Sequence, residues 1–229
     1  TRHPALLLSD TISSLGSLDY RMDAWGIDVT VGGSQKGLML PTGMSMTGVS
    51  DKALEVAARS KMPRHYFNWQ MMNARKPQSF VGTAPVHLFF GLQESLRMIE
   101  EEGLDAVIAR HTRLGEATRA AVRAWGAGGK GPQLFCQAED RLSNSVTTVM
   151  MPEGHSSDGM RKAAVERFNL SLGGGLGPLM GKVFRIGHMG DLNEPMLLGC
   201  LATTELAMKT AGVPFAPGGV DAAIASLAG

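Results

Sequence analysis

One lysine stands in an unusual place for a charged side chain. Lys36 lies within "VTVGGSQKGLMLP", between a β-branched run and a glycine, and no acidic residue lies within six positions on either side. Burial without a counter-ion strips water from an ammonium group, and the neutral amine that this favours is a nucleophile able to form a Schiff base. The small residues Gly33, Ser34 and Gly37 leave room for a planar group beside it. The alternative is a lysine on a surface turn, which the local pattern alone favours.

An acidic residue upstream offers this lysine a chemical partner. Asp10 ends the run "PALLLSD", where a strand should emerge at the carboxyl edge of a sheet, the edge at which open α/β sheets bind ligands. A cap for the following "TISSLGS" explains Asp10 equally well. An acid and an amine in one crevice suit pyridoxal phosphate, because the lysine can hold its aldehyde while the carboxylate keeps its pyridine nitrogen protonated. A P-loop is excluded, because Gly37 follows the lysine where that motif needs Ser or Thr.

The elements that must position these residues indicate an α/β protein. The runs "PALLLSD" and "GIDVTVGG" fit buried strands of a parallel sheet. Ser50 is a plausible N-cap for a helix over "DKALEVAARSK". Two further sets of residues recur at helical spacing. The first set is Phe89, Leu92, Leu96 and Ile99, and the second is Leu104, Val107, Ile108, His111, Leu114, Thr118, Ala121, Val122 and Trp125.

A domain boundary is expected between these two helical sets. Gly103 interrupts them directly after the acidic cluster 100–102, so we predict one domain over residues 1–102 and a second over residues 103–229. After the break "GAGGKGP", strands are expected near "SVTTVMM" and "KVFRIG". Helices are expected over residues 158–168 and 193–211. Their alternation predicts a small α/β or α+β layer.

Composition narrows the classes of partner. Lys and Arg number 22 against 21 for Asp and Glu, so the net charge of +1 provides no field that would attract nucleic acid or an anionic membrane. A small-molecule partner is therefore expected. Two cysteines give neither a disulfide framework nor metal-ligand spacing, which favours a reducing, cytoplasmic location. No apolar run is long enough to span a bilayer, and "TRHPALLLSD" lacks the apolar core of a signal peptide.

Several stretches of the chain resemble a known family in their residues and in their order. The segment "LLLSDTISSLGSLDYRMDAWGIDVTVGGSQKGLMLPTG" resembles the cofactor segment of class V, fold-type I aminotransferases, specifically the alanine/serine-glyoxylate aminotransferase group. The likeness continues through "SFVGTAPVHLFFGLQESL", "EEGLDAVIARHTRL" and "SLGGGLGPLMGKVFRIGHMGDLN". It implies an α/β fold made of part of the large, pyridoxal-phosphate-binding domain and a small C-terminal domain. The family's N-terminal portion, with its phosphate-binding glycine turn and ring-stacking aromatic, would be missing.

The resemblance assigns four residues to the cofactor. Lys36 would hold pyridoxal 5'-phosphate as a Schiff base and then act as the acid–base catalyst. Asp10 would bind the pyridinium nitrogen, Ile12 would pack on the ring, and Gln35 would lie beside the ring or the phosphate. Each stands at the matching position of the family motif.

The segment "FVGTAP" implies a homodimer with shared active sites. Thr83 corresponds to a threonine that reaches the phosphate of the neighbouring subunit's cofactor, and Phe80 stands where some relatives use a tyrosine for the same purpose. This sequence has Val81 and Gly82 in place of the commoner proline and tyrosine, which removes an aromatic group near the mouth of the active site. A helix N-cap ahead of a proline is the alternative role for Thr83.

The resemblance also implies a substrate-binding arginine. Arg185, in "GKVFRIGH", corresponds to the arginine that grips the substrate's α-carboxylate, a task suited to a permanently charged group with two parallel donors. Without the resemblance it would pass for an ordinary strand arginine. The glycine run 173–178 fits a mobile segment near the entrance, or simply a turn. His111 and His188 are not assigned to the site.

The implied function is a transamination from a small amino acid, such as serine, alanine or aspartate, to glyoxylate or a similar 2-oxo acid. Two alternatives stay open. One is another fold-type I enzyme, a cysteine desulfurase or a lyase; Cys136 and Cys200 argue against a desulfurase, because they are expected in a strand and a helix rather than in a mobile loop. The other is a non-catalytic piece that only packs or dimerises, and binds the cofactor weakly by itself.

Overall fold

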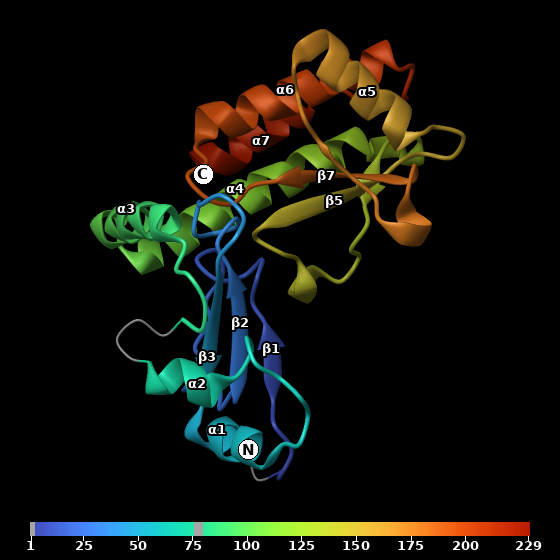
Figure 1. Cartoon of the computed structure of the whole chain (residues 1–229). Coiled ribbons are helices and arrows are strands. Elements are labelled where there is room, and N and C mark those ends of the chain that lie inside the picture. Colours follow the sequence, from blue (N-terminus) through green and yellow to red (C-terminus); the bar gives the residue numbers. More distant parts are fainter. Residues whose placement is uncertain (1–2, 76–79) are drawn as a thin grey trace. The chain divides into compact units, whose positions relative to one another are not determined.

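The chain forms two compact α/β units, Thr1–Leu104 and Asp105–Gly229 (Figure 1). The computed structural model describes residues 3–75 and 80–229. In that described part of the chain, no helix is both long and apolar enough to cross a bilayer. Because each unit has its own sheet and its own helices, each is described by itself.

The first unit contains a three-stranded sheet in the order β1-β2-β3. Strand β1 (Leu8–Asp10) runs parallel to β2 (Val29–Gly33), and β3 (Ser45–Val49) pairs with β2 in the antiparallel sense. The two predicted strands and their parallel pairing are confirmed, and β2 is largely buried as expected. The expectation that β1 is buried is wrong for this structure. Leu8 is 65% exposed, because β1 is an edge strand paired on one side only among the described residues.

The buried carboxylate of Asp28 connects three segments at the start of this sheet. Asp28 accepts hydrogen bonds from the backbone N–H of Leu7 (2.8 Å), the hydroxyl of Ser50 (3.1 Å) and the ammonium group of Lys52 (3.1 Å). The bond from Leu7 is the main reason that the pKa of Asp28 is lowered. A single side chain thus ties the segment before β1 to the segment before β2 and to the first helix.

Three helices complete the first unit. They are α1 (Asp51–Arg59), α2 (Trp69–Ala74) and α3 (Val86–Glu102). Ser50 caps α1 as predicted, by accepting from the N–H of Ala53. Helix α3 occurs where the periodicity predicts it, but it buries Leu88 and Ser95, whereas Phe89 and Leu96 are 38% and 44% exposed.

The second unit contains an antiparallel sheet in the order β4-β5-β7-β6. The predicted strands correspond to β5 (Val146–Met150) and β7 (Val183–Gly187), which run side by side in Figure 1. The predicted helices are confirmed within a residue or two at each end. The remaining elements are α4 (Leu104–Trp125), η1 (Ala127–Gly129), β4 (Gln133–Leu134), η2 (Glu139–Arg141), α5 (Ser157–Phe168), β6 (Gly173–Gly174), η3 (Gly177–Leu179), α6 (Glu194–Thr210) and α7 (Gly219–Ala228).

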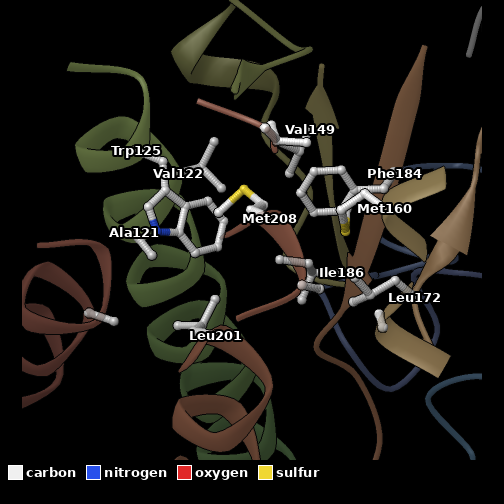
Figure 2. Packing of buried hydrophobic residues seen from close by; sticks show 14 of the residues in the cluster. Ala121, Val122, Trp125, Val149, Met160, Leu172, Phe184, Ile186, Leu201 and Met208 are labelled. Atoms are coloured by element: carbon white, nitrogen blue, oxygen red, sulfur yellow. The ribbon is translucent and has the colours of Figure 1, made fainter. Parts of the chain in front are cut away.

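Helices and sheet of the second unit enclose a dense apolar core. Figure 2 shows Trp125 of α4 and Met208 of α6 in the same core as Phe184 of β7, and all three side chains are fully buried. The one polar atom of Trp125 is satisfied, because its indole N–H donates to Glu205 at 2.8 Å. Each large side chain buried in this way contributes about 1.5–3 kcal/mol relative to an exposed one.

A buried polar network lies beside this core and joins α4 to the sheet. Because a carbonyl oxygen can only accept, His188 donates from Nδ1 to Asn144 O (3.0 Å), and its Nε2 accepts from the Thr147 hydroxyl (2.9 Å). Arg119 donates from Nη1 to Ser143 O (3.0 Å). The network fixes the residues that lead into β5 and out of β7.

Candidate active site

Lys36 lies in a turn that directly follows β2. The strand ends at Gly33, and residues 34–38 form the turn. Lys36 is half-buried rather than buried, and its ammonium group makes no hydrogen bond or ion pair with any other described residue. Of the two alternatives, a buried lysine and a lysine on a surface turn, the structure shows a turn with a lysine that is only half-buried and has no counter-ion among the described residues.

Ser34 holds this turn in place through hydrogen bonds. Its sequence context indicated only that it is a small residue beside Lys36. Its hydroxyl donates to Pro41 O (2.7 Å) and accepts from Met44 N (3.3 Å), and its backbone N–H donates to Met44 O (3.0 Å). Ser34 is fully buried, so these bonds lie away from water. Helix α3 adds a further bond, from the Ser95 hydroxyl to Leu38 O at 2.6 Å. Lys36 therefore lies on a segment that is fixed by hydrogen bonds on both sides of it.

The turn after β2 touches the turn after β1 through two glycines. A Cβ on Gly37 would lie 2.2 Å from Leu15 O and 2.8 Å from Ser17 Oγ. Gly16 has a φ of +74°, and a Cβ there would lie 3.2 Å from Gly37 O. No other residue fits at Gly37 without a shift of the backbone. Sequence reasoning missed Gly16, whose only signal is a glycine within "SLGS".

Asp10 occupies the carboxyl end of β1, as predicted. It is the last residue of the strand and pairs with Val31 of β2. Its Oδ1 accepts from the N–H of Ile12 at 2.9 Å, so the capping role that the local pattern allowed is present. Asp10 is exposed, and its Oδ2 has no partner among the described residues. One oxygen thus orients the carboxylate and the other is available to a ligand.

Ile12 and Gln35 converge above Gly33. A Cβ on Gly33 would lie 3.3 Å from both Ile12 Cγ2 and Gln35 Oε1. The structure thus brings together a glycine, an aliphatic side chain and an amide at the ends of two adjacent strands. Both distances are shorter than ordinary contacts of a Cβ, so a glycine at position 33 lets Ile12 and Gln35 pack closely here.

Phe80 and Thr83 lie in the loop that leads into α3. Phe80 is half-buried and packs edge-to-face on Phe89, with ring centroids 5.4 Å apart. Thr83 is exposed. The helix-cap alternative for Thr83 is wrong, because the N-cap of α3 is Pro85 and no side chain caps this end. Neither residue makes a hydrogen bond with Lys36 in the described part of the first unit.

Arg185 belongs to the second unit, in the middle of β7. It is half-buried, and its Nε donates to Gly174 O at 2.8 Å. Neither of its Nη atoms has a partner among the described residues, so two parallel donors are available. The glycine run beside it, predicted as a mobile segment or a turn, is partly the strand β6.

His188 and the two cysteines of the second unit are not assigned to the site. His188 is fully buried, and burial lowers its pKa to about 4, so the ring is neutral. Cys200 lies in α6, where burial raises the pKa of its thiol. Cys136 lies in the loop after β4 rather than in a strand, so the sequence argument about its context is wrong. Among the described residues, no three His, Cys, Asp or Glu side chains cluster as a metal ion would require.

Comparison with known proteins decides the family. The family described as class-V aminotransferases matches residues 1–173. The chain belongs to the class-V aminotransferases. It is 47% identical over 225 residues to a serine–glyoxylate aminotransferase of Arabidopsis thaliana, and this match covers 97% of the chain and 55% of the plant protein. It is 42% identical over 224 residues to an L-aspartate–glyoxylate aminotransferase of Paracoccus denitrificans, again over 97% of the chain and 55% of the relative.

Solved structures agree with this class-V assignment. The pyridoxamine–pyruvate aminotransferase of Mesorhizobium loti superimposes with a TM-score of 0.88 at 32% identity, over 98% of this chain and 57% of that one. The predicted resemblance and the α/β fold of fold-type I aminotransferases are therefore confirmed. The chain spans about half the length of these relatives.

Proposed function

We propose that this class-V chain carries the active-site lysine and the substrate arginine of a pyridoxal-phosphate-dependent transaminase. The observation that carries the proposal is the pair of adjacent strand ends. The Asp10 carboxylate stands at the end of β1, Lys36 lies without a partner among the described residues on the turn after β2, and the turns beyond the two strands are in backbone contact. The names of the relatives support glyoxylate as the amino acceptor, and serine, alanine or aspartate as donors.

The residues at these strand ends fit pyridoxal phosphate. Ile12 would pack on the ring and Gln35 would lie beside the ring or the phosphate; both side chains lie against Gly33 at the end of β2, within 3.3 Å of the place of its missing Cβ. The Asp10 carboxylate would bind the ring nitrogen through its unused oxygen, and Lys36 would hold the aldehyde. When bound, the cofactor would supply an electron sink for the charge that develops at the substrate's α-carbon.

Two side chains of the protein would have separate roles in the reaction, Lys36 in proton transfer and Arg185 in substrate binding. The Lys36 amine takes the proton from the substrate's α-carbon and later returns one, which requires a neutral amine and therefore no adjacent carboxylate. The Nη atoms of Arg185 hold the α-carboxylate of the amino acid and of the 2-oxo acid in turn. One arginine suffices for both half-reactions because both substrates carry the same carboxylate.

The proposal includes a homodimer with shared active sites. The exposed Thr83 hydroxyl would contact the phosphate of the neighbouring subunit's cofactor, with Phe80 beside it. A small-molecule partner, with no role for nucleic acid or a membrane, agrees with the net charge of +1. A cytoplasmic location also stays a prediction.

Substitution of the lysine tests the proposal. The complete protein incubated with pyridoxal phosphate should show a visible absorbance band that borohydride removes, and a pyridoxyl group should then be found on the peptide that contains Lys36. Lys36→Ala should abolish both signals. Lys61→Ala, at an exposed lysine of the same unit, is the matched control. An unchanged spectrum in Lys36→Ala would contradict the assignment.

The donor is identified by a panel of amino acids tested against glyoxylate. Serine, alanine and aspartate should each be supplied, with hydroxypyruvate, pyruvate and oxaloacetate followed as products. Sulfide release from cysteine, without transamination by any of these donors, would support the desulfurase alternative instead.

A further inference from the structure

We propose that Gly173 positions Arg185 so that its guanidinium holds the substrate carboxylate end-on, through Nη1 and Nη2. The inference rests on the proposed role of Arg185 as the carboxylate-binding residue. It adds a positioning residue and a binding geometry to that role. Both follow from the pairing of two short strands in the second unit.

The register of β6 and β7 sets Arg185 directly beside Gly173. The two residues are antiparallel partners, and Gly174 is paired with Phe184. A Cβ on Gly173 would lie 3.1 Å from Arg185 Cβ and 3.3 Å from its Nε. Side chains on directly opposed residues of an antiparallel pair normally lie against each other. Here the arginine occupies the space that a side chain at position 173 would need, and it lies along β6.

This position lets the backbone of β6 take one donor of the guanidinium. Arg185 Nε donates to Gly174 O at 2.8 Å, a charge-assisted bond. A carboxylate can bind an arginine side-on, through Nε and one Nη, or end-on, through both Nη atoms. The side-on mode needs the Nε–H, which is already hydrogen-bonded to Gly174 O. The end-on mode is therefore the one that is left.

Strand β6 is itself held in place from its other side. Arg161 of α5 donates from Nε to Leu172 O at 2.8 Å and pairs with Asp158 at 3.1 Å. A Cβ on Gly174 would lie 2.7 Å from Arg161 Nη1. A second arginine thus bonds the residue just before β6 and lies against Gly174, whose carbonyl accepts from Arg185.

Substitution of Gly173 tests the positioning role. In the complete protein loaded with pyridoxal phosphate, Gly173→Ala should displace the guanidinium from Gly174 O. The KM for the amino donor and the inhibition constant of acetate, a bare carboxylate, should each rise about 10- to 100-fold, the range for loss of a hydrogen bond to a charged group. The value of kcat should change much less, because Lys36 is untouched.

Two further variants separate positioning from folding. Gly187→Ala is the matched control, because Gly187 lies on β7 and a Cβ there would meet nothing within 4 Å. It should leave KM unchanged. In an Arg185→Ala background, Gly173→Ala should cause no further rise in KM, since there is no guanidinium left to displace. An additive effect would mean that Gly173 acts elsewhere and would overturn the inference.

A measurement on the unsubstituted protein covers the case in which Gly173→Ala fails to fold. In nitrogen-15 NMR spectra, the Arg185 Nε–H signal, identified by its loss in Arg185→Lys, should exchange slowly with solvent. Acetate should shift the Nη signals and leave the Nε signal nearly in place. A large Nε shift would indicate side-on binding and overturn the inference.

The same experiments distinguish failure of the inference from failure of the proposed function. If Arg185→Ala leaves the KM and the acetate inhibition constant unchanged, Arg185 does not bind the carboxylate and both fail. If Arg185→Ala raises them but Gly173→Ala does not, only the positioning role of Gly173 fails.

Discussion

At the scale of single residues, burial decides what a titratable group can do. His188 is enclosed by Asn144, Thr147 and the nearby cationic Arg119, and its pKa falls to about 4 mainly because burial disfavours the charged ring. His188 lies outside the candidate site, but its lowered pKa still affects the stability of the protein, because its protonation is linked to folding.

The pH dependence of stability should reveal this linkage. As pH falls from 6.5 toward 4, the unfolded chain takes up a proton at position 188 before the folded chain does, so stability is complete above 6.5 and is lost across that window. The loss should total about 3 kcal/mol. His188→Gln, measured by urea unfolding at a series of pH values, should flatten this slope, whereas the same substitution at exposed His65 serves as the control. An unaltered slope in His188→Gln would rule out this linkage.

The proposed reacting groups could be named from the sequence, and the contacts that hold them in place could not. Lys36 and Asp10 carry their chemistry in their residue type and in their position after an apolar run. The hydrogen bond from Arg185 to Gly174 O depends on the register between β6 and β7. That register is set by pairing across the sheet rather than by local sequence pattern. Sequence reasoning therefore named the arginine and missed the carbonyl that orients it.

At the scale of elements, the two turns beyond β1 and β2 behave as one structure. Their contact through Gly16 and Gly37 has no local signature, since the reason for each glycine lies about twenty residues away along the chain. The strands themselves were predictable from their apolar runs. The exposure of β1 was not, because burial depends on what covers a strand and not on its composition.

Gly37→Ala should damage both the fold and the site. The added Cβ would lie 2.2 Å from Leu15 O, so the turn that carries Lys36 must move, at an expected cost of about 2 kcal/mol or more in the free energy of unfolding. The visible band formed with pyridoxal phosphate should weaken in the same variant.

The control for this prediction is Gly91→Ala in α3. There the new Cβ would meet Leu40 at 3.4 Å, an ordinary contact, and alanine favours a helix over glycine by up to about 1 kcal/mol. Urea unfolding should therefore show equal or higher stability for Gly91→Ala. Equal losses in both variants would mean that the contact between the turns has no special importance.

At the scale of the whole molecule, the two units differ in how far each can bury its own apolar surface. The large core cluster lies entirely within residues 114–223, and it includes Trp125, Phe184 and Leu201. The first unit exposes several large apolar side chains. They are Leu7, Leu8, Trp25, Val56, Met62, Tyr66, Phe67, Val86, Phe89, Phe90, Leu96 and Leu104. The second unit exposes fewer, which are Phe135, Val165, Leu176, Met180, Met196, Leu206 and Ile224.

This difference predicts that the second unit folds by itself. A chain of residues 105–229 has the size of an ordinary domain and contains a complete core, so it should unfold cooperatively in urea. Its single tryptophan, Trp125, is fully buried and should emit at short wavelength until the unit unfolds. A matched chain of residues 1–104 should aggregate or unfold without cooperativity, because its exposed apolar side chains have nothing to cover them. Red-shifted emission from the 105–229 chain in buffer would show that its core needs the first unit, and would remove the reason for treating the two units as separate domains.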